Sequence, residues 1–582
     1  MLNRLQLKRW LENWHDQYVA RLSRADAQLQ PAILGLFVGL LTGMVIVAFR
    51  WLIEQSQIAM LPGQDPEGYE ALATFWRLLI PVVSGLLIGL LFQATSRDSY
   101  VVGIIHVMER LAYHEGQIRW KKFLLQFAGA GIAIIGGHSV GREGPSVHLG
   151  GATGSLLGQY LGVPNNNVRI LVGCGTAAAI AASFNTPLAG VVFAMEVVML
   201  EYTITSFIPV ILAAVSATGV TVAVYGNSPV FIIPELTFSS LQELPYVVVL
   251  GLLCGMVATL FIRLVARLAE RTSAWPFVVK TTVAGSIVGI IGCVYPEVMG
   301  IGYDTVSGAM IGELGLVLLL GVLLAKIVAT AAAIGLGIPG GVVGPSLFMG
   351  AMLGSGIGYV TVAISPEFSS DIGFYTVLGM TAMMASMLRA PLAALVAILE
   401  MTYTPTIIFP GMLAIVIAEL TRSEMFHQVS IFRSLLQARG LDINMNPMTQ
   451  ALQRIGVASQ MSRRFVVLPP SCSIEEARTA LQQEPHWILL QEGAEPHSVM
   501  PAIDLARYLE EVKPADGVNL EEIPAKRNAV AGIHKRASLR EADDQMRAMG
   551  LEILYIYDIP APGLKRVRGI IERSIIESSY RL

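Results

Sequence analysis

One carboxylate stands inside apolar sequence, and its neighbours are suited to binding an anion. Glu143 is the centre of the pentapeptide GREGP, residues 141–145. Glycine lets a ligand approach the backbone closely, and proline in the first turn of a helix sacrifices no hydrogen bond. The free N–H groups of a helix start, at the positive end of the helix dipole, bind anions. A carboxylate at that position competes with the anion for the same donors until it is protonated. We therefore predict that Glu143 is a gate.

The neighbouring Arg142 allows a second interpretation of Glu143. A carboxylate at membrane depth is costly, so it is a functional candidate by default. An ion pair between Arg142 and Glu143 would satisfy the carboxylate without any role in transport. The sequence favours the gate over this structural ion pair.

The pattern around Glu143 occurs twice, 200 residues apart. GREGPSVHLGGATGSLLG (141–158) and GVVGPSLFMGAMLGSGIG (341–358) are identical at eight of 18 positions. Two such helix starts aimed at one point would bind a halide strongly enough to dehydrate it and weakly enough to release it. Close packing of small-residue helices is the alternative. The matched offsets favour a pair of anion-facing helix starts.

A second pair of segments supports an internal duplication. NTPLAGVVFAMEVV (185–198) and RAPLAALVAILEMT (389–402) share the pattern P-L-A-x-x-V-x-x-x-E. A glycine, Gly175 or Gly379, precedes each proline by 12 residues. Each half is thus predicted to contain a glycine-rich helix start, a small-residue helix and a further helix that carries a carboxylate.

The elements that must position these motifs are membrane helices. The chain has 582 residues, of which 54% are hydrophobic and only 14% charged, whereas soluble domains have about 25% charged residues. Apolar spans are expected at 32–53, 77–95, 122–136, 168–200, 206–225, 245–267, 278–298, 313–335, 345–363, 374–402 and 405–420. Several are interrupted by glycine or proline, which is tolerated at membrane depth where the freed backbone groups line a cavity or meet a ligand.

The chain is expected to have three parts. Residues 1–30 predict a cytoplasmic amphipathic helix, residues 31–445 a transmembrane domain and residues 446–582 a cytoplasmic α/β tail. Basic residues before the first apolar span indicate a cytoplasmic N-terminus. A net charge of −3 gives no indication of a basic surface that would bind nucleic acid. The four scattered cysteines suggest neither a disulfide framework nor a metal site.

The tail repeats one order of elements. Segments 464–508 and 529–579 each predict strand, helix, strand, strand and helix. Ser473 and Ser538 each precede a predicted helix and are followed three residues later by glutamate, which is the pattern of a capping box.

Together these motifs resemble the CLC chloride channel and transporter family over about residues 30–445. The segments on which the resemblance rests are GREGP at 141–145, GGVVGP at 340–345, FNTPLAG at 184–190 and LRAPLAALVAILEMT at 388–402. The resemblance implies an all-α polytopic membrane protein, a homodimer in which each subunit has its own pore built from two inverted-repeat halves with broken helices. It also implies that Glu143 is the gating glutamate. The implied anion-binding positions are Arg142, Gly144, Val342, Val343 and Gly344.

Three positions depart from the family pattern at the central anion site. The family's G-S-G-I-P filter aligns with VVGII (101–105), which places Val102 where a serine hydroxyl is usual. Phe432, in SIFRSLL, stands where a tyrosine hydroxyl is usual, and Val343 stands where the second signature has phenylalanine. Two hydroxyl donors are therefore missing. Because each neutral hydrogen bond contributes roughly 1 kcal/mol, we expect weaker or altered anion selectivity.

A fourth departure concerns proton coupling. Proton-coupled members carry an inner carboxylate directly after F-x-x-E, and here Val197 follows Glu196 at that position. This favours channel-like anion flow, with proton/chloride exchange as the alternative. Water or another carboxylate such as Glu201 can substitute for the missing group, so exchange stays open.

The tail resembles a tandem CBS pair, a module that often binds adenosine nucleotides. Asp504, in PAIDL, matches the aspartate that such modules usually use in the final β-α turn of the first unit. The second unit has Glu572 at the corresponding place. We therefore expect a packing and dimerising tail, with nucleotide binding doubtful.

Other patterns are discounted. GHSVG (137–141) matches G-x-S-x-G, but a membrane-embedded serine hydrolase using Ser139 would need a strand-to-helix elbow. GLGIPG (335–340) lacks the context of a dinucleotide site. The histidines His106, His138 and His148 are interpreted as structural. A CBS-bearing metal-cation transporter would need more polar ligands along the spans.

The sequence thus predicts a voltage-gated chloride transport protein rather than an enzyme. We expect no resident cofactor and no metal, with chloride or another small anion as the transported ligand. The expected partners are membrane lipid and a second copy of the chain. The expected location is the bacterial inner membrane, with both termini in the cytoplasm.

Overall fold

A computed structural model describes most of the chain. The described residues are 28–62, 66–95, 100–227, 231, 236, 238–441, 447–493, 495–512, 517–561 and 564–579. The predicted N-terminal helix lies, except for residues 28–30, outside them. Contacts divide the chain into two units: residues 31–160 with 169–443 form the helical unit, and residues 161–168 with the described part of 444–582 belong to the second.

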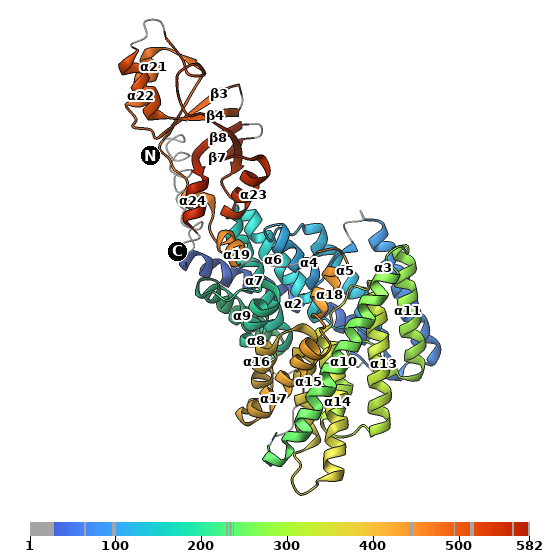
Figure 1. The fold of residues 1–582 in the computed structure, drawn as a ribbon. Helices are drawn as coiled ribbons and strands as arrows, with labels where there is room; N and C mark the ends of the chain where they lie inside the picture. The colour runs from blue at the N-terminus through green and yellow to red at the C-terminus, as the bar shows by residue number, and fades with distance from the viewer. Residues whose placement is uncertain are drawn as a thin grey trace. The chain divides into compact units, whose positions relative to one another are not determined.

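The helical unit consists of packed apolar helices (Figure 1). Its longer helices are α2 (Leu29–Met60), α3 (Thr74–Gln93), α5 (Trp120–Ile135), α6 (Glu143–Leu161), α7 (Asn165–Phe184), α9 (Ile204–Tyr225), α10 (Leu244–Arg271), α11 (Phe277–Val294), α13 (Leu316–Gly335), α14 (Val343–Ile364), α15 (Ile372–Leu388), α16 (Pro391–Thr402) and α17 (Ile408–Leu420). The shorter ones are α4 (Ile104–Tyr113), α8 (Pro187–Phe193), α12 (Tyr303–Met310) and α18 (Ile431–Gln437). Within the described ranges, nine helices are long and apolar enough to cross a membrane. The expected polytopic architecture is confirmed.

Two of the predicted apolar spans are each divided into two helices. The stretch 168–200 forms α7 and α8, and the stretch 374–402 forms α15 and α16. The backbone turns into the left-handed region at each break, at Asn185 (φ 58°) and Arg389 (φ 60°). A helix-starting proline follows two residues later in both cases. Proline interrupts a continuing helix because it lacks the backbone N–H and its ring clashes with the preceding turn.

The internal duplication appears as repeated packing. Residues 131–150 and 331–350 each end one helix, make a tight turn and a single bridge, and begin the next helix. A Cβ atom on Gly150 would lie 2.1 Å from the Gly175 carbonyl oxygen, and one on Gly350 would lie 2.3 Å from that of Gly379. The glycines upstream of the two P-L-A segments thus let α7 and α15 contact α6 and α14 directly. Any side chain at these crossings would force the helices apart.

The tail contains a six-stranded mixed sheet. Its strands are β1 (Phe465–Leu468), β3 (Trp487–Glu492), β4 (Glu495–Pro501), β6 (Asn528–His534), β7 (Ile553–Ala561) and β8 (Leu564–Glu572), in that spatial order. β1 pairs with β3, and β6 with β7, in parallel, whereas β3–β4, β4–β6 and β7–β8 are antiparallel. A separate pair joins β2 (Ser471–Cys472) and β5 (Val518–Asn519). The twice-repeated strand and helix order is confirmed and is consistent with a CBS pair.

The helices of the tail cover two separate apolar cores. α21 (Ile474–Leu481) and α22 (Ala502–Glu511) pack with the first repeat, and α23 (Leu539–Met549) and α24 (Arg573–Ser578) with the second. α19 (Pro447–Gln453) and α20 (Val457–Gln460) precede the sheet. Both predicted capping boxes are present: Ser473 pairs reciprocally with Glu476, and Ser538 with Glu541.

Candidate functional site

The two glycine-proline motifs meet at their first glycines. Gly141 and Gly341 form an isolated antiparallel bridge in which each N–H donates to the other's carbonyl oxygen over 2.8 Å. The two glycines are 200 residues apart in the sequence. The bridge joins the two halves at the point where α6 and α14 begin. The pairing of the motifs, which the sequence could only suggest, is therefore direct.

Only glycine fits at this junction. A Cβ atom on Gly144 would lie 2.6 Å from the Cα atom of Gly341, and one on Gly341 would lie 2.5 Å from the Gly144 nitrogen. Both distances are far below van der Waals contact. The backbones of α6 and α14 thus approach each other at their N-terminal ends, where the first-turn N–H groups have no acceptor within their own helix.

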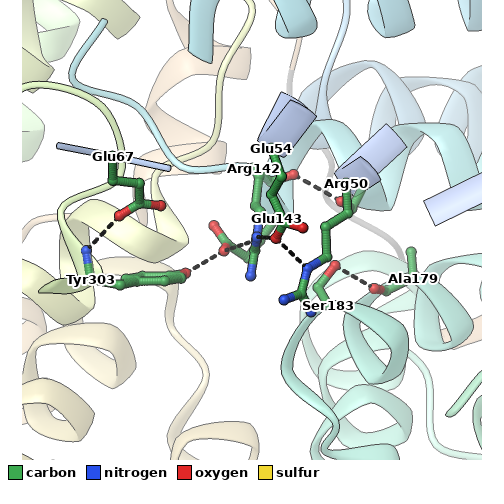
Figure 2. Close-up of polar contacts among 9 residues, drawn as sticks. Arg50, Glu54, Glu67, Arg142, Glu143, Ala179, Ser183 and Tyr303 are labelled. Atoms are coloured by element: carbon green, nitrogen blue, oxygen red, sulfur yellow. Dashed lines mark hydrogen bonds and ion pairs between the residues drawn. The ribbon is translucent and has the colours of Figure 1, made fainter. Parts of the chain in front are cut away.

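Glu143 is fully buried beside this junction. A Cβ atom on Gly141 would lie 2.5 Å from its Oε2 atom, and one on Gly344 would lie 3.1 Å from the same oxygen. The carboxylate therefore rests over bare backbone from both motifs. Its Oε1 atom accepts a hydrogen bond from the Tyr303 hydroxyl, whereas Oε2, within the described part of the chain, has no hydrogen-bond partner (Figure 2).

Arg142 does not hold Glu143 in a close ion pair. Its Nε atom lies 4.0 Å from Glu143 Oε1, at the limit of a salt bridge, and its Nη1 atom lies 3.8 Å from Glu54 Oε1. Glu54 in turn pairs with Arg50 at 2.6 Å (Figure 2). Arg142 thus spreads its charge between two carboxylates. This geometry gives little support to the structural ion pair.

Tyr303 is a site residue that the sequence analysis missed. It is the first residue of α12, and its partner Glu143 is 160 residues away in the chain. Its backbone N–H donates to Glu67 Oε2 over 3.0 Å (Figure 2). The sequence gives little indication of this role, because a tyrosine within an apolar region shows only that its hydroxyl needs a hydrogen-bond partner and not which one.

The segment between α2 and α3 contributes two carboxyl groups with perturbed acidity. Burial, reinforced by the Asp304 carboxylate, raises the pKa of Glu67 to about 7. The same two causes raise the pKa of Glu70 to about 7. Both groups thus titrate near neutral pH, and Glu67 contacts the site through the Tyr303 N–H.

The predicted filter segment lines a cavity of about 390 Å³. Val102 and Gly103 form one wall, and residues 334–340, which lead into the second motif, form another. Two cationic side chains, Lys280 and Arg439, also line the cavity. Positive groups at the mouth of a narrow path concentrate anions. The cavity, the paired helix starts and the buried carboxylate together have the chemistry of an anion pathway.

Comparison with known proteins decides the family. The family model described as voltage gated chloride channel matches residues 84–423. A putative chloride channel protein ClcB-like from Ralstonia nicotianae is 35% identical over 400 residues, which is 67% of this chain and 92% of that protein. The chain belongs to the CLC family. It is accordingly an anion transport protein with many membrane-spanning helices.

Other CLC proteins are more distant. The H(+)/Cl(-) exchange transporter ClcA of Salmonella agona is 28% identical over 411 residues, 68% of this chain and 86% of that protein. The structure of a slow cyanobacterial Cl-/H+ antiporter has a TM-score of 0.63 at 23% identity and covers 70% of this chain and 97% of its own. A eukaryotic CLC transporter has a TM-score of 0.60 at 18% identity over 94% of this chain and 98% of its own. These two structures share the fold.

The three central-site positions that depart from the CLC pattern lie in different surroundings. Val102 lines the cavity with Lys280 and Arg439, whereas Phe432 is buried in α18 and is not part of that lining. Val343 faces a different, apolar cavity with Leu347 and residues of α7, α15 and α16. Val102 therefore presents an apolar side chain to the cavity beside the predicted filter segment.

Val197, at the inner proton position, is buried in a π-helical turn, residues 194–199. The adjacent Glu196 accepts hydrogen bonds from the Leu392 and Ala393 N–H groups over 3.1 and 2.7 Å. Glu196 therefore caps the start of α16, a role that the sequence did not predict. Glu201, the proposed substitute, accepts from the Thr203 hydroxyl over 3.2 Å.

The tail residues of interest have protein partners. Asp504 accepts from the Lys526 N–H over 3.3 Å, and Glu572 accepts from the Trp487 indole over 3.1 Å.

In the helical unit, the Ser139 hydroxyl lies 2.9 Å from that of Thr330, and His106 lies 2.9 Å from His148. The Ser139 contact is with a threonine and offers no general base.

Proposed function

We propose that this CLC protein exchanges chloride, or a closely related anion, for protons, with Glu143 as the gate. The observation that carries the proposal is the buried Glu143 carboxylate lying over the glycine backbone where α6 and α14 meet. An ionised carboxylate there occupies the position that a halide would take at the two helix starts. Protonation removes its charge, weakens its hold and lets the anion enter.

The gate also couples the two ions. For exchange, a side chain that leaves the pathway only when protonated must take up a proton from one side of the membrane and release it to the other side before the path closes. Alternation between anion and proton at one position is what exchange requires. The similarity to a Salmonella H(+)/Cl(-) exchange transporter and the shared antiporter fold support exchange over passive flow.

Channel-like flow is the second candidate, and one observation favours it. Val197 provides no carboxylate at the inner proton position, and the neighbouring Glu196 is engaged with α16. A proton would then need water or another side chain to reach Glu143. This candidate makes a different prediction for proton movement.

A flux assay with simultaneous proton readout tests the proposal. Purified protein in liposomes receives a chloride gradient while a pH-sensitive dye reports on the lumen. We expect the gradient to drive protons uphill, and we expect Glu143→Gln to carry chloride with no proton movement and with no dependence on pH. Chloride flux without any proton movement in the native chain would establish the channel instead. Absence of anion flux would refute transport.

We further propose that the chain is a homodimer in the bacterial inner membrane, with both termini in the cytoplasm. The buried charge of Glu143 gives the membrane potential a group on which to act, which is the proposed basis of voltage sensitivity. The tail is proposed to be a CBS pair that packs and dimerises, because Asp504 and Glu572 already have protein partners.

A further inference from the structure

Tyr303 contacts the gate from the other half of the molecule. It begins α12, whereas Glu143 begins α6. Its hydroxyl donates to Glu143 Oε1 (Figure 2), and a Cβ atom on Gly344 would lie 3.4 Å from that hydroxyl oxygen. The phenol thus ends at the same patch of bare backbone as the carboxylate. A donor in this place meets whichever acceptor occupies the junction.

The phenol ring is held in one orientation. Phe231 packs edge-on against it with ring centroids 4.8 Å apart, and the Arg142 guanidinium lies 5.7 Å from its centroid. The backbone N–H of Tyr303 is bound to Glu67 over 3.0 Å. These contacts come from three different segments. A donor whose ring and backbone are both fixed acts with little loss of side-chain entropy.

The loop before Tyr303 is fixed as well. The buried Lys326 ammonium group, from α13, donates to the carbonyl oxygens of Val298, Gly300 and Ile301 over 3.1, 3.3 and 3.2 Å. It also lies 4.4 Å above the Phe348 ring of α14. A buried charge is retained where its donors are satisfied. Lys326 thus ties the start of α12 to the helix that precedes the second motif.

We propose that Tyr303 is the positioning residue that holds ionised Glu143 in the closed pathway. A hydroxyl donor favours a charged acceptor over a neutral one. The bond is therefore strongest when Glu143 is ionised and weakens when the carboxyl group gains its proton. Tyr303 thereby sets the pH at which the gate releases. This inference rests on the proposed role of Glu143.

Other charged groups face the same site and have to be counted. They are Arg142 beside Glu143 on α6, Arg50 and Glu54 on α2, Glu67 before α3, Asp304 on α12 and Lys326 on α13. None of them is removed by Tyr303→Phe, which deletes one hydroxyl and keeps the ring against Phe231 and Arg142. The substitution therefore isolates the hydrogen bond.

The test measures chloride flux of the full chain in liposomes from pH 4.5 to 8. In Tyr303→Phe, we expect the midpoint pH of flux to rise by about one unit and the flux at pH 7 to rise about tenfold, as one lost charge-assisted bond implies. In Glu143→Gln, which has no titrating gate, adding Tyr303→Phe should change neither the flux nor its pH profile. An unchanged midpoint in Tyr303→Phe, or an equal change in both backgrounds, would overturn the inference.

A matched control is present in the same unit. Tyr375, on α15, donates its hydroxyl to Glu243 Oε2 over 2.5 Å, away from the junction. Tyr375→Phe removes the same kind of bond and should leave the midpoint pH unchanged. Elution by size exclusion shows whether each variant is folded. If Glu143→Gln itself keeps native proton coupling and pH dependence, the proposed gate is wrong; if only Tyr303→Phe is silent, the positioning role alone is wrong.

Discussion

At the residue scale, the chemistry is concentrated in groups that are buried without a full set of partners. Glu143 has one satisfied oxygen and one without a partner among the described residues, over backbone that no side chain covers. An orphaned buried acceptor is costly, and it persists where the site requires it. A carboxylate with one unpaired oxygen is consistent with the proposed gate, which has to leave its position.

Glu67 provides a prediction about stability and pH. Its pKa, raised from 4.5 to about 7, means that the folded chain binds more protons than the unfolded chain between these values. The free energy of unfolding should therefore fall as pH rises through this window, by roughly 3 kcal/mol. Glu67→Gln keeps an acceptor for the Tyr303 N–H and removes the titration. Thermal unfolding in detergent should show the variant near the native chain at pH 5 and above it at pH 8.

The comparison for that experiment is Glu367→Gln, at an exposed position in the loop after α14. It should follow the native chain at every pH. A Glu67→Gln variant that loses stability equally at pH 5 and pH 8 would mean that the carboxyl group acts only as a hydrogen-bond acceptor.

At the element scale, the two halves exchange their helix caps. Glu196 accepts from the first N–H groups of α16, and Glu400, at the end of α16, accepts from the Leu188 and Ala189 N–H groups of α8 over 2.9 and 2.7 Å. Each P-L-A helix thus starts on the carboxylate of the other repeat. A proline in the first turn and a carboxylate acceptor together satisfy that end of each helix.

This exchange predicts matched losses of stability. Glu400→Ala and Glu196→Ala each leave two N–H groups of a helix start without their acceptor, so we expect each to lower the free energy of unfolding by about 2 kcal/mol. Thermal unfolding of the purified variants measures this, with Glu367→Ala as the surface comparison. Very unequal losses would contradict the idea that the two caps are equivalent.

The sequence predicted the repeated motifs but not how they are completed. The matched offsets of GREGP and GVVGP indicated two facing helix starts, and Gly141 and Gly341 do pair. The prolines of the P-L-A segments indicated a break, but nothing in the sequence marked the left-handed conformation of Asn185 and Arg389 before them. Tyr303 and the exchanged caps depend on partners 160 to 212 residues away. Periodicity and local motifs carry no information on such contacts.

At the scale of the whole molecule, every residue of the proposed pathway belongs to the helical unit. Glu143, Tyr303, Val102 and the start of α14 lie within residues 31–160 and 169–443. The family model ends at residue 423, and the Ralstonia relative is covered over 92% of its length by 400 residues of this chain. The tail has its own sheet and its own apolar cores.

Removal of the tail should therefore spare transport. A chain ending at residue 445 retains the paired helix starts, the buried carboxylate and the cavity with Lys280 and Arg439. We expect its anion flux per folded protein to stay within about twofold of the full chain, with the same midpoint pH, because the truncation removes none of the residues of the proposed gate. Flux and proton movement in liposomes measure both. A folded, truncated protein that has lost flux, or whose midpoint has moved by a unit or more, would place the tail in the transport cycle itself and make it more than a packing module.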